Sequence, residues 1–122
     1  MTHTPGFLTL VNDAKSRVKQ IDIAQYQQMA AAAERHILID VREDGEWAEA
    51  HAAGAVHLGK GIIERDIETV IPDKTARLVL YCGGGFRSAL AGDALQKMGY
   101  SDVISLDGGW RAWRGAGLPV EK

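Results

Sequence analysis

The residue with the clearest chemical potential is Cys82, the single cysteine of the 122-residue chain. It follows an apolar run at residues 77–81 and precedes three consecutive glycines, Gly83, Gly84 and Gly85. Because glycine adopts positive φ without steric cost, such a turn can aim several backbone N–H groups at one point. Inward N–H groups at the start of a helix attract anions and stabilise a thiolate, which lowers the pKa of a cysteine. The pattern predicts a reactive thiol in an anion-binding loop.

The next three residues complete this loop. Phe86 opens a pattern of helical spacing, so Arg87 and Ser88 fall in the first turn of a helix. The guanidinium of Arg87 stays charged at any relevant pH and can support the loop or contact an anionic substrate. The Ser88 hydroxyl can donate or accept a hydrogen bond. The alternative is an inert core cysteine, but three successive glycines cost backbone entropy and favour a reactive thiol.

Composition argues against several other classes of function. A lone cysteine supplies neither an intramolecular disulfide nor a multi-cysteine zinc site, and His3, His36, His51 and His57 lack tight ligand spacing. We therefore expect no metal and no cofactor. The net charge of -2 favours no nucleic-acid partner, and no apolar stretch approaches the ~18 residues of a membrane span. The free thiol is typical of a reducing compartment, which predicts a cytoplasmic protein.

Short apolar runs alternate with helical patterns around this loop. Strands are predicted at 36–41, 54–58, 77–81 and 103–106. One helix is predicted to be capped by Asp22 and to run through Gln25 to residue 34, and others are predicted at 44–51, 62–70, 86–98 and shortly after Gly109. This alternation favours an α/β sandwich with a mainly parallel sheet and helices on both faces. Ligands of such sheets bind beyond the carboxyl ends of the strands, which is where Cys82 falls.

The N-terminal part of the chain is predicted to be an amphipathic helix. Apolar residues recur there at helical spacing, at Phe7, Leu10, Val11, Ala14 and Val18. We expect residues 1–19 to form a helical extension that covers a sheet edge or meets a partner, and residues 20–122 to form one domain. Nothing in the sequence marks an obligate interface, so we expect a monomer or a weak dimer.

Three segments resemble the signatures of the rhodanese family and cover roughly residues 20–120. The first consists of Leu-Ile-Asp-Val-Arg at 38–42, Glu-Trp at 46–47 and His-Ala-Ala-Gly-Ala at 51–55. The second is the Cys82–Ser88 loop. The third consists of Leu-Asp-Gly-Gly-Trp at 106–110, Trp113 and Gly-Leu-Pro at 117–119. Ala50 stands where the family usually has a glycine. The resemblance implies a three-layer sandwich around a mainly parallel five-stranded sheet, and it makes Cys82 the sulfur-carrying nucleophile.

The resemblance also implies roles for neighbouring residues. Gly83, Gly84, Gly85, Phe86, Arg87 and Ser88 are expected to bind substrate. Asp40 and Arg42 are expected to support the loop, most simply as an ion pair at a strand end. Apart from the resemblance, Lys60, Arg65 and Arg42 are candidates for steering an anionic donor, although ordinary solvated charge is the favoured explanation for Lys60 and Arg65. The two glycines after Cys82 leave the mouth of the loop open.

The expected activity is that of a thiosulfate sulfurtransferase. Cys82 takes the outer sulfur of thiosulfate or a similar donor and passes it to cyanide or a thiol. One alternative is a persulfide carrier that delivers sulfur to a partner protein, and another is a silent interaction domain. A phosphatase or arsenate reductase is disfavoured, because Arg87 follows Cys82 by five positions, one fewer than the related phosphatases have.

Overall fold

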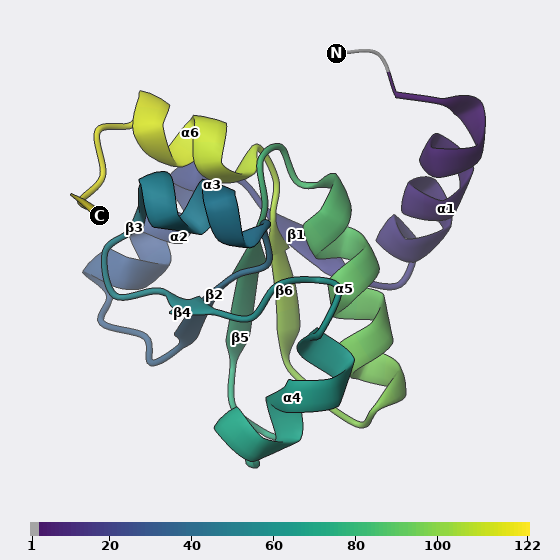
Figure 1. The fold of residues 1–122 in the computed structure, drawn as a ribbon. Coiled ribbons are helices and arrows are strands. Elements are labelled where there is room, and N and C mark those ends of the chain that lie inside the picture. Colours follow the sequence, from purple (N-terminus) through teal and green to yellow (C-terminus); the bar gives the residue numbers. More distant parts are fainter. Residues whose placement is uncertain (1–2) are drawn as a thin grey trace.

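The computed structural model describes residues 3–122 and has a five-stranded sheet at its centre (Figure 1). The strand order is β1-β6-β5-β2-β4, and every pairing is parallel. The strands are β1 (Lys19–Ile21), β2 (Ile37–Asp40), β4 (Val56–His57), β5 (Leu78–Tyr81) and β6 (Val103–Leu106). The predicted α/β sandwich with a parallel sheet is therefore confirmed.

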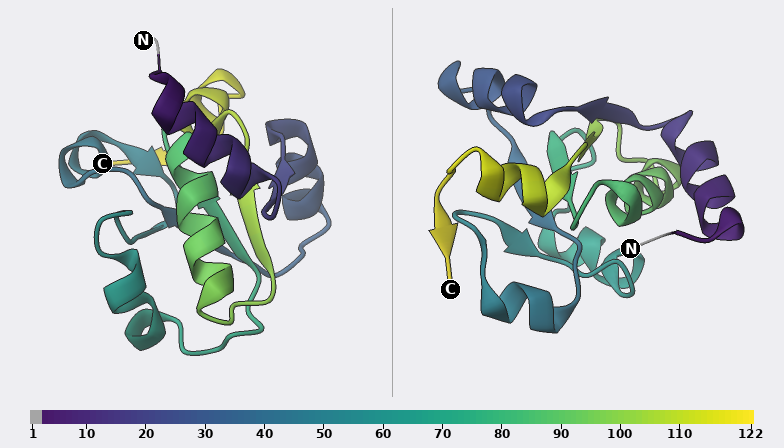
Figure 2. Two further views of the ribbon diagram at one scale, coloured as in Figure 1. Left: turned by 90° about the vertical axis from the view of Figure 1, so that its right-hand side faces the viewer. Right: turned by 90° about the horizontal axis from the view of Figure 1, so that it is seen from above.

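Helices cover both faces of this sheet. They are α1 (Pro5–Lys15), α2 (Ile23–Ala31), α3 (Asp44–Glu49), α4 (Ile63–Val70), α5 (Phe86–Lys97) and α6 (Gly109–Gly115). One apolar core lies between the sheet and α4 and α5, and the other lies between the sheet and α2 and α6. Helix α1 packs against α5 (Figure 2). Within residues 3–122, no helix combines the length and apolar character needed to cross a bilayer.

Strand β5 determines the direction of the thiol. Side chains alternate between the two faces of a strand, so Leu78, Leu80 and Cys82 join the core under α4 and α5. Val79 and Tyr81 join the core under α2 and α6. Both faces are buried, which explains why the run is apolar throughout. Cys82 therefore points toward the start of α5.

Two elements near the N-terminus differ from the prediction. Strand β1 was not predicted, because only Ile21 of its three residues is buried and no apolar run marks it. The start of helix α2 agrees with the prediction, because Asp22 caps the helix and forms a capping box with Gln25. The helix ends at Ala31 rather than residue 34, and Ala33 follows with a φ of 56°.

A second, two-stranded sheet was also not predicted. Strand β3 (His51–Ala52) pairs antiparallel with β7 (Val120–Glu121) and joins the end of the chain to the segment after α3. Two residues per strand are too few to leave a readable alternation. The helix expected to reach residue 51 accordingly ends at Glu49. The division of the chain at residues 19 and 20 stays a prediction, and β1 begins at that point.

Candidate active site

The thiol loop, Cys82–Ser88, turns directly from the end of β5 into α5. The backbone N–H groups of Gly85 and Ser88 donate to Cys82 Sγ over 3.1 and 3.4 Å. Gly85 makes this turn at a φ of 103°, a left-handed conformation that favours glycine. The sulfur thus lies at a point where several N–H dipoles converge.

This environment favours the thiolate form of Cys82. Burial of the thiol, whose residue is 1% exposed, raises its pKa. Hydrogen bonds from the Ser88 hydroxyl and from the N–H groups of Ser88, Gly85 and Gly84 lower the pKa and outweigh the burial. The Ser88 hydroxyl lies 3.5 Å from the sulfur and 2.8 Å from the Ser105 hydroxyl on β6. The net pKa of Cys82 lies below its ordinary value.

Helix α6 fixes the backbone of the thiol loop from the side. The N–H of Trp110 donates to the Cys82 carbonyl over 2.7 Å, and that of Arg111 donates to the Gly83 carbonyl over 3.2 Å. Gly109 permits this approach, because a Cβ on it would overlap the Cys82 carbonyl oxygen. Its φ of 47° also belongs to the left-handed region. The third sequence signature is therefore packed onto the second.

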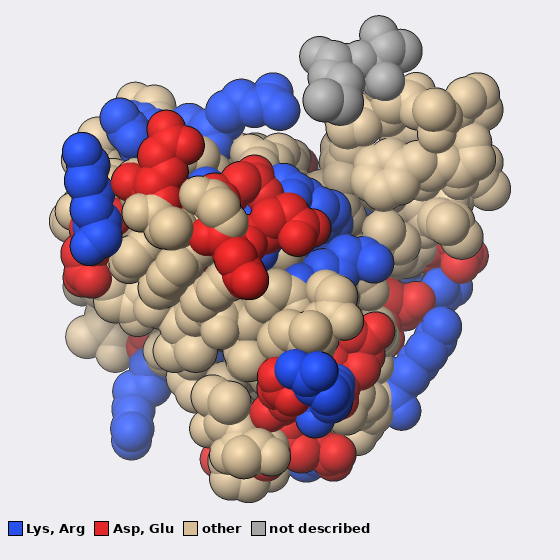
Figure 3. Space-filling view, viewed as in Figure 1, with Lys and Arg blue, Asp and Glu red and all other residues tan. Residues whose placement is uncertain are grey.

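The thiol lies at a pocket of about 580 Å³. Of the predicted loop residues, Gly83, Gly84, Phe86 and Arg87 line it together with Cys82. Four further lining residues were not predicted as site residues: His3, Phe7, Glu46 and Arg111. Figure 3 shows this side of the molecule, where charged side chains gather near α3 and the upper part of α1 is free of them. Helix α1, expected at a sheet edge or a partner, instead packs on α5 and contributes to the pocket.

Arg87 forms an ion pair with Glu46. Its Nη1 and Nη2 donate to the two carboxylate oxygens over 2.8 and 3.3 Å, which connects the first turn of α5 to α3. The Arg87 guanidinium lowers the pKa of Glu46, and the carboxylate in turn raises the pKa of Arg87. Of the two roles predicted for this arginine, the structure shows the supporting contact. Its role in substrate binding stays a prediction.

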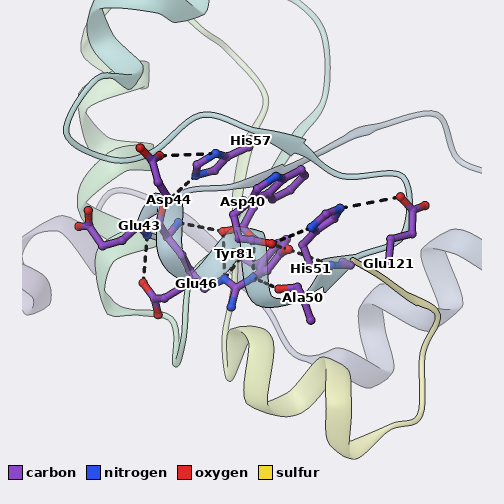
Figure 4. Close-up of polar contacts among 12 residues, drawn as sticks. Asp40, Glu43, Asp44, Glu46, Ala50, His51, His57, Tyr81 and Glu121 are labelled. Atoms are coloured by element: carbon purple, nitrogen blue, oxygen red, sulfur yellow. Dashed lines mark hydrogen bonds and ion pairs between the residues drawn. The ribbon is translucent and has the colours of Figure 1, made fainter.

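The Asp40–Arg42 cluster lies at the end of the neighbouring strand β2, of which Asp40 is the last residue (labelled in Figure 4). Asp40 is fully buried and Arg42 is 3% exposed. The guanidinium of Arg42 donates to the Asp40 carboxylate over 2.8 Å and to the Ala50 carbonyl over 2.7 Å. The Tyr81 hydroxyl donates to Asp40 and accepts from the N–H of Ala52. The cluster therefore joins β2, β5 and the segment after α3.

Arg42 contacts Trp110, whose backbone holds the thiol loop, and the ring of Tyr81, the residue before Cys82. Its guanidinium lies 4.5 Å from the centre of the Trp110 ring, and the backbone of Trp110 holds the Cys82 carbonyl. Lys60 and Arg65 are absent from the residues that line the pocket. Arg65 pairs with Asp66 over 2.7 Å, as expected of solvated charge. Among residues 3–122, no three His, Cys, Asp or Glu side chains form a group that could hold a metal ion.

Known proteins similar to this chain match it over the region that contains the three sequence signatures. Residues 22–116 match the Rhodanese-like domain family. "Putative sulfurtransferase YtwF" of Bacillus subtilis (strain 168) is 37% identical over 102 residues, which are 84% of this chain and 96% of that protein. "Thiosulfate sulfurtransferase GlpE" of Vibrio cholerae (strain O395) is 33% identical over 83% of this chain and 92% of that protein. "Putative sulfur carrier protein YrkF" of Bacillus subtilis is 29% identical, and the match spans only 53% of its length.

Solved structures give the same fold. A protein of unknown function from Rhodopseudomonas palustris CGA009, described as a "Possible Tyrosine Phosphatase", is 28% identical with a TM-score of 0.86. That similarity covers 99% of this chain and 98% of the other. A thiosulfate sulfurtransferase from Pseudomonas aeruginosa is 30% identical with a TM-score of 0.76, over 86% of this chain and 20% of the other. With its parallel sheet, its cysteine loop and a family match over most of its length, the chain belongs to the Rhodanese-like domain family.

Proposed function

We propose that this protein is a sulfurtransferase that carries a sulfane sulfur as a persulfide on Cys82. The observation that carries the proposal is the ring of donors around the thiol. Backbone N–H groups of Gly85 and Ser88 lie 3.1 and 3.4 Å from Sγ and lower the pKa of Cys82 against the effect of burial. The same groups can stabilise the negative charge of a terminal persulfide sulfur, as the donors of an oxyanion hole do.

Sulfur transfer from thiosulfate needs two displacements. The Cys82 thiolate attacks the outer sulfur of the donor, the S–S bond of thiosulfate breaks, and sulfite leaves with the electron pair. The acceptor, cyanide or a thiol, then attacks the outer sulfur of the persulfide and the pair returns to Cys82 as thiolate. Charge and atoms balance in both steps without a metal or a redox cofactor. The cycle predicts ping-pong kinetics, with parallel double-reciprocal plots.

The direct test is the intact mass of the protein after incubation with thiosulfate. We expect a gain of one sulfur atom that cyanide removes and that Cys82→Ser does not acquire. The variant protein should unfold at the same urea concentration as the parent, since serine nearly matches cysteine in size. A parent protein with a free thiol that gains no mass from thiosulfate or any other sulfane donor would overturn the proposal.

The physiological acceptor is proposed to include another protein, in a reducing cytoplasm. The similarity to a sulfur carrier protein supports this extension, and so do the glycines that leave the loop open. Persulfidated protein should pass its sulfur to a protein thiol faster than to 2-mercaptoethanol at equal concentration if a protein is the acceptor. Asp40 and Arg42 are proposed to support the loop through Trp110 rather than to touch the sulfur.

A phosphatase activity is the second candidate, because the Rhodopseudomonas palustris protein carries that description. Within the loop, the cation that would hold a phosphate ester is Arg87, and both of its terminal nitrogens are already paired with Glu46. The segment from Cys82 to Arg87 is also one residue shorter than in the related phosphatases. We therefore expect no Cys82-dependent hydrolysis of an aryl phosphate under conditions that load the persulfide. Hydrolysis that Cys82→Ser abolishes would favour the phosphatase.

A further inference from the structure

The pocket at Cys82 is larger than an inorganic donor requires. Its volume is about 580 Å³. A five-atom anion such as thiosulfate fills on the order of 150 Å³ if each heavy atom takes roughly the ~30 Å³ of a water molecule. Pockets of about 300–1,000 Å³ are typical of sites for organic ligands. The remaining space can therefore hold the body of a larger substrate.

One wall of this pocket consists of three aromatic rings. The His3 ring lies 4.5 Å from the Phe86 ring and 5.3 Å from the Phe7 ring, measured between centroids. Phe7 and Phe86 are 6.2 Å apart. Each of the three is only partly buried, and the Lys15 ammonium lies over Phe86 at 4.7 Å. The wall offers an aromatic surface next to the thiol loop, with rings inclined to one another by 40–61°.

Helix α1 is anchored firmly enough to be part of the site. Arg17, just after α1, donates to both carboxylate oxygens of Asp93 on α5 over 2.9 and 2.8 Å. Gln96 donates to the Arg17 carbonyl over 3.0 Å. Gly92 leaves the space that Val18 fills, since a Cβ there would lie 3.1 Å from a Val18 methyl carbon. These contacts hold the wall that carries Phe7 against α5.

A cation faces the same pocket. Arg111 lines it from α6, and its Nη2 would lie 3.4 Å from a Cβ on Gly84. The Arg111 side chain makes no ion pair with the carboxylates among residues 3–122, whereas Arg87 is occupied by Glu46. An exposed guanidinium of this kind can bind a carboxylate with two parallel hydrogen bonds.

We propose that, besides a protein thiol, the site accepts as sulfur acceptor an organic thiol that combines an aromatic body with a carboxylate. His3, Phe7 and Phe86 contact the aromatic body, and Arg111 binds the carboxylate. This inference rests on the proposed persulfide function and names its substrate class. The two kinds of contact lie beside one thiol, so a single small molecule can use both.

Transfer to such a thiol is a simple exchange at sulfur. The outer sulfur of the Cys82 persulfide takes up a proton from water, and the acceptor thiolate then attacks that sulfur. A bond forms between the acceptor sulfur and that outer sulfur, and the bond from the outer sulfur to Cys82 Sγ breaks. The electron pair returns to Cys82 as thiolate, and the proton stays on the transferred sulfur. No oxidant or reductant enters.

The test uses full-length protein loaded with thiosulfate and freed of excess donor. Loss of the added sulfur is timed by intact mass with 4-(mercaptomethyl)benzoate, with benzyl mercaptan, with 3-mercaptopropionate and with cyanide. We expect the rate ratio of 4-(mercaptomethyl)benzoate to cyanide to fall about tenfold in Arg111→Gln. The benzyl mercaptan to cyanide ratio should fall severalfold in His3→Ala and Phe7→Ala. His3 precedes α1, so its replacement leaves the helix intact.

Leu10→Ala is the matched control, because Leu10 is on α1 but 61% exposed and outside the pocket. It should keep both ratios of the parent protein. The inference would be overturned if the organic-thiol to cyanide rate ratios were the same in the parent, Arg111→Gln and His3→Ala. In that case the proposed function would still stand, provided that Cys82 loads with sulfur and cyanide removes it. Failure to load Cys82 at all would overturn the proposed function and the inference with it.

Discussion

Two polar groups lie at the same edge of the sheet, one after β5 and one after β2. Asp40 pairs in register with Tyr81, the residue before Cys82. In the Asp40–Arg42 cluster, the carboxylate, the guanidinium and the Tyr81 hydroxyl all bind one another or backbone groups. In the thiol loop, backbone N–H groups converge on one sulfur that faces an open pocket. One group is closed and the other is accessible.

This difference shows that location at the carboxyl edge of a parallel sheet does not by itself make a reactive site. A charge whose partners are all supplied by the protein stabilises the fold and has little capacity left for a substrate. Donors that converge on a reactive atom at a pocket remain available to a new anion. We therefore expect changes in the first group to lower stability and changes in the second to lower reactivity.

The largest effect should come from Asp40→Asn. It leaves the buried guanidinium of Arg42 without its counter-ion, and breaking a buried ion pair costs about 3–5 kcal/mol. We expect the free energy of unfolding in urea to fall by that amount, while the folded fraction still acquires sulfur on Cys82. Asp66→Asn, which breaks the exposed pair with Arg65, should leave the urea midpoint unchanged. If Asp40→Asn were as stable as the parent but no longer formed the persulfide, the Asp40–Arg42 cluster would serve reactivity and not stability, contrary to our expectation.

Gly109→Ala tests where the two regions meet. A methyl group there collides with the Cys82 carbonyl and must adopt a φ of 47°. Strain of both kinds should cost about 2–4 kcal/mol of stability, and it should also slow persulfide formation because the loop moves. Gly115→Ala is the matched control on the same helix, where a Cβ meets no atom within 4 Å. Normal loading in a destabilised Gly109→Ala protein would show that the loop tolerates displacement.

Ser88→Ala should give the smallest change in stability and a clear change in reactivity. It removes the hydroxyl 3.5 Å from the sulfur, and with it one cause of the lowered pKa of Cys82. In the parent, iodoacetamide should alkylate Cys82 with a midpoint at a pH below that of a free cysteine. In the variant the midpoint should move to higher pH. The rate at pH 7 should fall by about tenfold, the effect of losing roughly 1.5 kcal/mol of hydrogen bonding to a charged group.

The exposed Ser101 provides the control for this experiment. Within residues 3–122, its hydroxyl donates to the Lys74 carbonyl and makes no other hydrogen bond, so Ser101→Ala should keep the pH midpoint of the parent. An unchanged midpoint in Ser88→Ala would mean that backbone N–H groups alone stabilise the thiolate. The reactivity of Cys82 would then depend wholly on the glycine turn, which would separate the thiol loop still more clearly from the Asp40–Arg42 cluster.

Local sequence was sufficient for four strands of the five-stranded sheet and for the location of Cys82 after β5. Strand β5 is apolar because both of its faces are buried, and the glycines after it indicate a turn that N–H groups can line. Strand β1 escaped prediction because it is an edge strand with one buried residue. Arg111 could have been noticed, since it directly follows the Gly-Gly-Trp segment that fixes the thiol loop.

The sequence by itself determined the parallel sandwich and the location of Cys82 at the start of a helix, because periodicity, apolar runs and glycine turns act over a few residues. Tertiary structure decided the partners of each charge. Glu46 reaches Arg87 from 41 positions away, and Arg17 reaches Asp93 across 76. It also brought His3 and Phe7 beside the thiol. Such contacts depend on how whole helices pack, and packing is set by the shapes of buried surfaces rather than by spacing along the chain.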